Sequence, residues 1–364
     1  MQMETQKKQM NLGLCLLRVW LSFEVVVDHY WHAKGLTGVM YFLSATRSLA
    51  VPCFLLMSFY LTANRYSGSD GVWLKTRFGR LFIPYFIWPV IYFVLIWVAA
   101  ALSPAFVTST ESLTEFKHYG FNVAVDGWDL VRQWLCGIDR RLVHQFWFHN
   151  NLIILTAAMF VLLKFVKDQR RRIYMLTALA MAGFALQYSP LNMWLFGRFD
   201  FEVKYSFGRL AATLPYAAIG LMIGFNRKRL AEIKGSMRTF LALSGLFLLF
   251  FVFYSNAMPR PKGLGYQGIN LILMALGTVT FFHYLPLERA PGWLAKGIDL
   301  VSRYCMGIYC CHLAIGWVLH AWLFPHIGVG HETFGGCLWI WAASWLCCWL
   351  IAQIPGRFSK ELVQ

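Results

Sequence analysis

Residues 81–102 read LFIPYFIWPVIYFVLIWVAAAL, an apolar stretch without a single charged side chain. A helix that crosses the roughly 30 Å hydrocarbon core of a lipid bilayer needs about 20 mainly apolar residues, and this stretch is long enough. The sequence therefore predicts a transmembrane helix here.

Similar apolar stretches recur along the whole chain. They cover about 11–32, 41–63, 147–166, 172–189, 207–225, 239–256, 268–285, 299–323 and 335–354. We therefore predict an all-α fold, a polytopic transmembrane bundle of about ten helices that forms a single domain over residues 1–364. The stretch 103–146 is too long for a plain connector, so we expect a re-entrant or surface helix within it.

The composition excludes an ordinary soluble protein. Hydrophobic residues make up 58% of the chain and charged residues only 14%, whereas soluble domains carry about 25% charged residues. The net charge of +16 would favour a nucleic-acid partner in a soluble protein. Here the Lys and Arg residues lie in short clusters between apolar stretches, as topology signals do. We expect a lipid bilayer as the partner and no nucleic acid.

The distribution of these basic residues predicts the orientation of the chain. With the N-terminus inside, more than twice as many Lys and Arg residues fall on the cytoplasmic side as on the outer side, which is the usual bias. We expect a multi-pass protein of the cytoplasmic (inner) membrane, with both termini in the cytoplasm and loop 103–146 outside. The first apolar stretch has no small-residue cleavage site, which indicates a retained helix rather than a signal peptide.

The cysteines do not indicate a disulfide framework or a metal site. Eight of the nine cysteines lie within apolar stretches, and only Cys136 is in a polar one. No metal-ligand spacing is visible among them, so we interpret them as small packing residues. We predict no metal and no permanently bound cofactor.

Polar residues in the first predicted helix form the most informative pattern. Ionisable side chains at membrane depth are costly, about 2.5–3.5 kcal/mol on insertion scales, so each is a functional hypothesis. Arg18 and His29 share one helix face, separated by about 16.5 Å along the axis. Ser22 and His32 fall close to the same stripe, and Asp28 is the carboxylate placed to orient His29. A structural role stays open, with a snorkelling arginine and interfacial histidines.

Basic residues gather at the cytoplasmic end of the third predicted helix, in the segment KTRFGRLFIP over 75–84. Arg77 and Arg80 are three residues apart and share a face once helical. Guanidinium groups bind phosphate in bidentate geometry, so we predict an anion site formed by these two with Lys75. Ordinary membrane anchoring is the alternative interpretation.

A third pattern lies in the ninth predicted helix, within SRYCMGIYCCH over 302–312. Tyr309 and His312 are three residues apart and surrounded by apolar residues. They are candidates for the interior of a site, and a purely structural hydrogen bond is the alternative.

Together these features resemble the membrane acyltransferase 3 family. Arg18 and His29 fit its Arg-x10-His signature, and Arg77 to Pro84 is similar to its Arg-x-x-Arg-[Leu/Ile]-x-Pro run. Four further segments follow in the family order: 51–61 with Ser58, 146–152 with Trp147, 214–224 with its Pro-Tyr pair, and 307–312 with Tyr309 and His312. Two positions depart from the family pattern: Phe59 replaces the usual Gly, and His149 stands where Leu is common.

The resemblance implies an O-acyltransferase whose donor is cytoplasmic acyl-CoA, with acetyl-CoA as the family default. The acceptor would be a hydroxyl group of a glycan or lipid-linked saccharide, as in O-acetylation of a cell-envelope polysaccharide. In this interpretation Arg18, Arg77, Arg80 and Lys75 bind acyl-CoA and His29 is catalytic. Some relatives carry a hydrolase-like domain after the bundle; here we expect transfer to be completed within the bundle.

Two other interpretations remain open at this point. Buried His, Arg and carboxylate residues also suit a proton-coupled transporter or flippase of a lipid-linked saccharide or small metabolite. The paired Gly/Pro-interrupted helices that inverted-repeat transporters favour are not visible in the sequence. A haem or metal membrane protein is a third possibility, but no Cys or carboxylate partners are arranged around His29 and His32.

Overall fold

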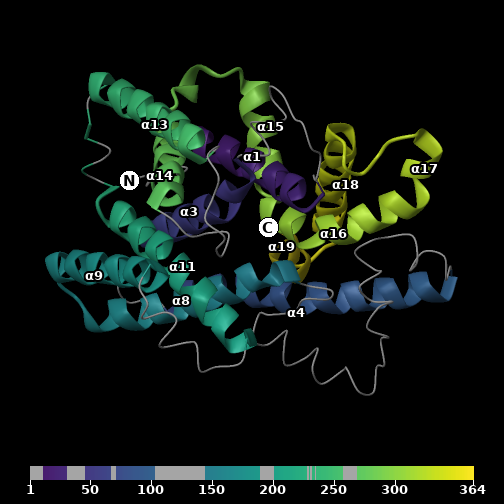
Figure 1. Ribbon diagram of the computed structural model, residues 1–364, viewed down its shortest axis with the longest axis horizontal. Coiled ribbons are helices and arrows are strands. Elements are labelled where there is room, and N and C mark those ends of the chain that lie inside the picture. Colours follow the sequence, from purple (N-terminus) through teal and green to yellow (C-terminus); the bar gives the residue numbers. More distant parts are fainter. Residues whose placement is uncertain are drawn as a thin grey trace, which may run out of the picture.

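The chain folds into helices, as its sequence predicts (Figure 1). The computed structural model describes residues 11–30, 46–66, 71–102, 144–188, 201–227, 229, 232–233, 235–256 and 269–364. No strand occurs within these ranges. The all-α fold class is therefore confirmed for the described part of the chain.

Ten long helices make up most of this part. They are α1 (Leu12–Tyr30), α3 (Ala50–Arg65), α4 (Gly71–Leu102), α8 (Trp147–Phe165), α9 (Gln169–Tyr188), α11 (Phe201–Phe225), α13 (Gly235–Asn256), α14 (Ile269–Tyr284), α16 (Cys305–Trp322) and α18 (Phe334–Gln353). The shorter helices are η1 (Arg47–Leu49), η2 (His144–Phe146), η3 (Leu287–Arg289), α15 (Gly292–Ser302), α17 (Phe324–Ile327) and α19 (Arg357–Val363).

Four helical segments are long and apolar enough to cross a membrane: Trp147–Phe165, Gly208–Phe225, Cys305–Trp322 and Phe334–Gln353. Three shorter apolar segments lie in α3, α13 and α14. The membrane character is thus supported, while the number of about ten spans and the cytoplasmic termini stay predictions. Most of loop 103–146, including the surface or re-entrant helix expected there, lies outside the described residues.

The predicted span 299–323 is wrong in one respect, because two helices occupy it. Helix α15 ends at Ser302 and α16 begins at Cys305, with a turn at Arg303 and Tyr304 between them. The Ser302 hydroxyl donates to the Asp299 carbonyl oxygen at 2.9 Å at this end of α15. Hydropathy runs through the turn without a break, so the apolar pattern alone does not reveal it. The turn places the charged Arg303 outside the apolar helix.

Helix α1 lies at the centre of the arrangement (Figure 1). It contacts α3, α14, α15, α16 and α18, while α4 contacts α8, α16 and the C-terminal helix α19. The indole nitrogen of Trp88 on α4 donates to the Leu362 carbonyl oxygen of α19 at 3.1 Å. Segments far apart in the sequence thus meet around α1, α4, α8 and α16, where the candidate site lies.

Helices α3 and α11 pack closely through two glycines four residues apart. A Cβ atom on Gly220 would lie 2.5 Å from the Leu56 carbonyl oxygen, and one on Gly224 would lie 2.5 Å from Ala63 Cβ. Small residues at this spacing let membrane helices approach until their backbones touch. The glycines therefore fix the position of α3, which carries Ser58.

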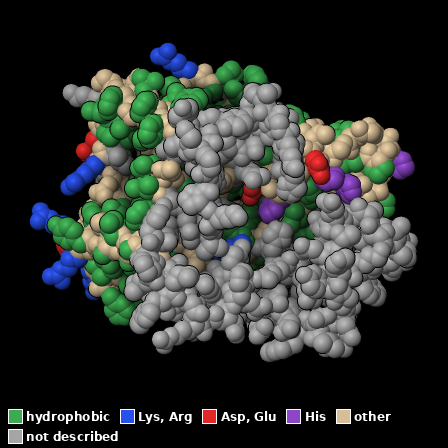
Figure 2. All heavy atoms as spheres, viewed as in Figure 1, with side chains coloured by type: hydrophobic (Ala, Val, Ile, Leu, Met, Phe, Trp, Pro, Cys, Tyr) green, Lys and Arg blue, Asp and Glu red, His purple; other side chains and the backbone are tan. Residues whose placement is uncertain are grey.

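Charged side chains are unevenly distributed over the visible face (Figure 2). Most visible Lys and Arg side chains lie at the left and top edges, towards α9 and α13, and histidine side chains lie from the middle towards the right, whereas acidic side chains are scattered from left to right. Much of the remaining described surface is apolar, for example Phe247 and Phe251 on α13, which are 68% and 57% exposed. An apolar face flanked by a basic edge suits a protein embedded in a bilayer.

Candidate active site

A cavity of about 310 Å³ opens between α1, α3, α4, α8 and α16. Its polar lining comes from these elements and from the chain end: Arg18, Ser58, Thr62, Thr76, Arg77, Arg80, Arg303, Cys305, Tyr309 and Gln364. Apolar side chains such as Phe54, Phe148 and Leu152 complete the wall. Four guanidinium groups around one cavity form a cationic site.

Arg77 is held in place by hydroxyl groups from two other helices. Its Nη2 donates to Ser58 Oγ at 2.9 Å and to Thr156 Oγ1 at 3.3 Å. The guanidinium also lies 5.6 Å from the centroid of the Phe59 ring. The aromatic side chain that replaces the usual family glycine thus supports the cation.

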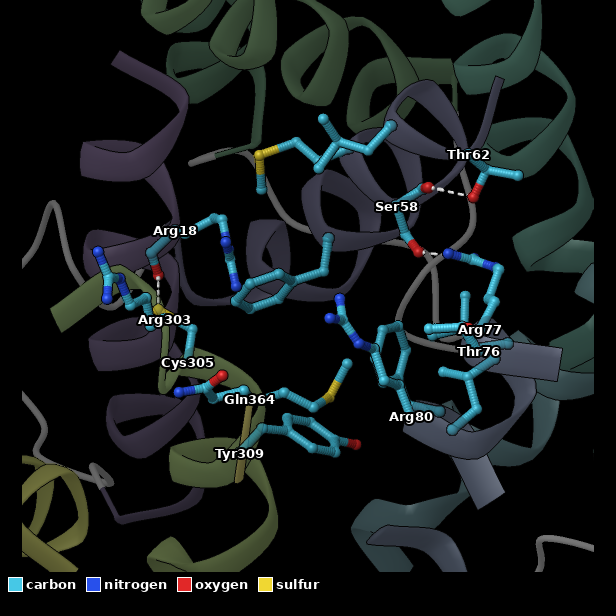
Figure 3. Close-up of a pocket in the computed structure, with 17 residues that line it drawn as sticks. Arg18, Ser58, Thr62, Thr76, Arg77, Arg80, Arg303, Cys305, Tyr309 and Gln364 are labelled. Atoms are coloured by element: carbon cyan, nitrogen blue, oxygen red, sulfur yellow. Dashed lines mark hydrogen bonds between the residues drawn. The ribbon is translucent and has the colours of Figure 1, made fainter. Parts of the chain in front are cut away.

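Arg18 and Arg80 approach the middle of the cavity from opposite walls (Figure 3). Arg18 comes from α1, where its carbonyl oxygen accepts a hydrogen bond from the Cys305 thiol at 3.2 Å. Arg80 comes from α4, one turn after Arg77. A ligand in this cavity would therefore have guanidinium groups on both sides.

Arg303 lines the cavity, but its guanidinium is turned away from the middle (Figure 3). Its Nη2 bonds the Asp299 carboxylate one helical turn earlier, and this bond raises the pKa of Arg303. In the sequence this arginine is recognisable only as a topology signal. Its proximity to α1 and α4 depends on the turn between α15 and α16, which no local pattern indicates.

Two imidazole rings meet beside this cavity. The centroids of the His29 and His312 rings lie 5.0 Å apart. Nδ1 of His312 is 2.9 Å from the Tyr309 carbonyl oxygen and 3.2 Å from that of Ile308. Because carbonyl oxygens only accept hydrogen bonds, Nδ1 must carry the proton. Nε2 of a neutral His312 is then the proton acceptor.

Tyr309 connects the cavity to the imidazoles. Its side chain lines the cavity, and its ring centroid is 6.2 Å from that of His312. The Tyr309 hydroxyl donates to the Gln145 carbonyl oxygen. The guanidinium groups and the imidazoles are thus linked through a single buried side chain.

The remaining predicted site residues lie apart from this cavity or outside the described residues. Lys75 is exposed on α4 and does not line the cavity. Trp147 is buried, and the Arg209 guanidinium carbon lies 4.3 Å from the centroid of its ring. Asp28 is half-buried one residue before His29. His32 lies outside the described residues.

Some residues at the site are revealed only by the packing of distant helices. The Thr156 hydroxyl on α8 accepts a hydrogen bond from Arg77. The backbone carbonyl oxygen of Gln145, in η2, accepts one from the Tyr309 hydroxyl. Neither belongs to a recognisable motif, so sequence reasoning missed both. Across the described ranges, no group of three or more His, Cys, Asp and Glu side chains is arranged to hold a metal ion.

This site brings guanidinium groups close to imidazole rings. Guanidinium groups bind phosphate or carboxylate through charge-assisted hydrogen bonds. An imidazole nearby is the side chain most often used as a general acid or base. The arrangement suits the attack of a hydroxyl group on an activated acyl compound that carries anionic groups.

Comparison with known proteins identifies the family. The profile described as an acyltransferase domain matches residues 11–352, nearly the whole chain. No match was found among curated proteins or among solved structures. The matched range includes Arg18, His29, Arg77, Arg80 and the segment that holds Tyr309. The chain belongs to the acyltransferase 3 family of membrane proteins.

Proposed function

We propose that this protein is an O-acyltransferase that takes an acyl group, acetyl by family default, from acyl-CoA. The acceptor is a hydroxyl group of a glycan or lipid-linked saccharide of the cell envelope. The single observation that carries this proposal is the junction at Tyr309. This side chain lines the cavity together with Arg18, Arg77 and Arg80, and its ring neighbours that of His312, which pairs with His29.

The cavity supports an anionic donor. Coenzyme A carries phosphate groups at separate positions, and Arg18 and Arg80 reach into the cavity from opposite walls (Figure 3). Each charge-assisted hydrogen bond to a phosphate contributes about 1.5–3 kcal/mol. Thr62 and Thr76 line the same cavity and add to its polar wall. The Thr62 hydroxyl itself donates to the Ser58 backbone carbonyl oxygen at 2.7 Å. The donor enters from the cytoplasm, where acyl-CoA is made.

The imidazole pair supports the chemical step. His29 takes the proton from the acceptor hydroxyl as the oxygen attacks the thioester carbonyl carbon. The carbon–oxygen bond forms, the carbon–sulfur bond breaks, and the coenzyme leaves as a thiolate. The proton held by the imidazole passes to this thiolate, which gives free CoA. His312, with its Nδ1 proton committed to backbone carbonyl oxygens, orients His29 or relays this proton.

The orientation predicted from the basic residues is compatible with this division of roles. Arg18 and His29 are about 16.5 Å apart along α1, so one helix connects a cytoplasmic donor site with groups nearer the outer face. The acceptor is then reached from the outer half of an inner-membrane bundle.

The test is transfer by purified protein in lipid vesicles. Labelled acetyl-CoA and an envelope saccharide fraction are supplied, and both free CoA and labelled saccharide are measured. A transferase releases one CoA for each saccharide that gains label. The transporter or flippase alternative predicts movement of saccharide across the vesicle membrane without CoA release. That result would refute the proposal.

A further inference from the structure

Two neighbouring side chains are buried with polar atoms that lack partners. Gln145 in η2 is 1% exposed and His149 in α8 is 0% exposed. Among the described residues, no hydrogen bond reaches Nε2 or Oε1 of Gln145 or Nδ1 of His149. The second ring nitrogen of His149, Nε2, lies 3.8 Å from the Cys310 thiol. Gln145 and His149 are four positions apart in the sequence, or about one helical turn.

Such a pair is unusual in a folded protein. The large majority of buried polar side-chain atoms have at least one hydrogen-bond partner, and an exception needs a reason. A leucine at the position of His149, common in the family pattern, would leave no polar atom unpaired there. A site built to bind a hydroxyl group carries unpaired donors and acceptors until its ligand arrives.

The pair is adjacent to the candidate active site. The His149 ring centroid is 5.4 Å from that of Tyr309, and the Tyr309 hydroxyl donates to the backbone carbonyl oxygen of Gln145. Tyr309 also lines the cavity and contacts His312. Tyr309 therefore lines the cavity and also neighbours His312, His149 and the backbone of Gln145.

The pair also lies away from the cationic part of the cavity. Thr156, which binds Arg77, is seven residues further along α8 than His149, or about 10 Å along the helix axis. An acceptor held at Gln145 and His149 would therefore lie about two helical turns along α8 from the Thr156 hydroxyl that holds Arg77.

We propose that Gln145 and His149 bind the acceptor, a neutral sugar or polyol, through its hydroxyl groups. This inference rests on the proposed function. The amide offers two donors and one acceptor, and the imidazole offers one further nitrogen, which matches hydroxyl groups that both donate and accept. An entering hydroxyl can also replace the Tyr309 hydroxyl at the backbone carbonyl oxygen of Gln145, because the two groups have the same hydrogen-bonding chemistry.

The test uses Gln145→Leu and His149→Leu in the full-length protein. Both substitutions remove unpaired buried atoms, so each variant should have a higher Tm in detergent than the wild type. Binding of acetyl-CoA should be unchanged. Transfer of label from acetyl-CoA to the saccharide fraction of membrane vesicles should fall at least tenfold. Trp345→Phe is the matched control, since Trp345 Nε1 on α18 is also buried without a partner among the described residues, and this variant should transfer normally.

Three results are decisive. Unchanged transfer in a stable His149→Leu protein would overturn the acceptor site while leaving the transferase intact. A lower Tm in both variants would also overturn it, because the pair would then be structural. A wild-type protein that never releases CoA would instead refute the proposed function.

Discussion

Arg77 on α4 and Ser58 on α3 are joined by a hydrogen bond of 2.9 Å between Nη2 and Oγ. The bond fixes one guanidinium on the wall of the cavity. We expect Ser58→Ala to weaken acetyl-CoA binding, because Arg77 then loses one of the hydroxyl groups that hold it in place. A hydrogen bond to a charged group contributes about 1.5–3 kcal/mol, which corresponds to about tenfold or more in Kd.

Isothermal titration with acetyl-CoA measures this effect. Thr239→Ala is the control, because the Thr239 hydroxyl donates within its own helix, to the Gly235 carbonyl oxygen at 3.2 Å. Equal affinities for the wild type and Ser58→Ala would show that Arg77 does not contact the donor.

Arg303 and Asp299 support a second prediction at the mouth of the cavity. Their ion pair keeps the Arg303 guanidinium turned from the cavity, and the Arg303 side chain is 55% exposed. We expect Asp299→Asn to release the guanidinium and tighten acetyl-CoA binding several-fold, and Arg303→Gln to weaken it by a smaller factor, through the loss of one positive charge at the mouth of the cavity. Both effects should shrink with added salt, since exposed charges are screened over about 8 Å at physiological ionic strength.

The measurement is the Kd of acetyl-CoA at low and high salt. Arg357→Gln is the control, because Arg357 belongs to a comparable exposed pair with Glu361 and does not line the cavity. An Asp299→Asn protein with unchanged affinity at low salt contradicts a role for Arg303 in donor binding.

Much of the helical fold follows from the sequence because long apolar runs encode it locally. The predicted spans 147–166 and 335–354 agree with α8 (Trp147–Phe165) and α18 (Phe334–Gln353) within one residue at each end. The turn at Arg303 was missed because hydropathy averages over it. Helix α19 was missed because it is short.

The sequence predicted those features of the site that depend on the spacing of residues within one helix. The spacing of Arg77 and Arg80 places both on one face of α4, and both line the cavity. Lys75 belongs to the same basic segment, yet it faces away because it lies two residues from Arg77. The Arg77–Thr156 and His149–Tyr309 contacts depend on how α4, α8 and α16 pack, which local patterns do not encode. The catalytic and binding roles themselves stay predictions.

Gly220 provides a prediction about stability. A methyl group at this position would meet the Leu56 carbonyl oxygen at 2.5 Å and Phe59 Cβ at 3.0 Å. Over-packing of this kind costs about 1–3 kcal/mol, so Gly220→Ala should lower the Tm in detergent. A methyl group on Gly297 in α15 would meet no atom within 4 Å, so Gly297→Ala should keep or raise the Tm. A Gly220→Ala protein as stable as the wild type would mean that α3 and α11 separate without cost.

His29 is the residue on which the chemical proposal depends. Its ring lies 5.0 Å from that of His312, whose Nδ1 proton is committed to the Tyr309 and Ile308 carbonyl oxygens. A sugar hydroxyl is a poor nucleophile at neutral pH unless a base removes its proton during attack. Loss of a general base lowers a rate by about 10²–10⁴-fold. We therefore expect His29→Ala to bind acetyl-CoA normally and to transfer label at least about a hundredfold more slowly.

The decisive comparison for His29 separates donor binding from transfer. His326→Ala serves as the control, because His326 is exposed on α17 and should not affect either step. If His29→Ala loses transfer but keeps acetyl-CoA affinity, the imidazole acts in the chemical step and Arg18, on the same face of α1, acts on the donor. If transfer persists, His29 is not the base. The role then passes to His312, whose Nε2 is the remaining acceptor nitrogen beside Tyr309, and the double variant His29→Ala with His312→Ala becomes the test of imidazole catalysis as a whole.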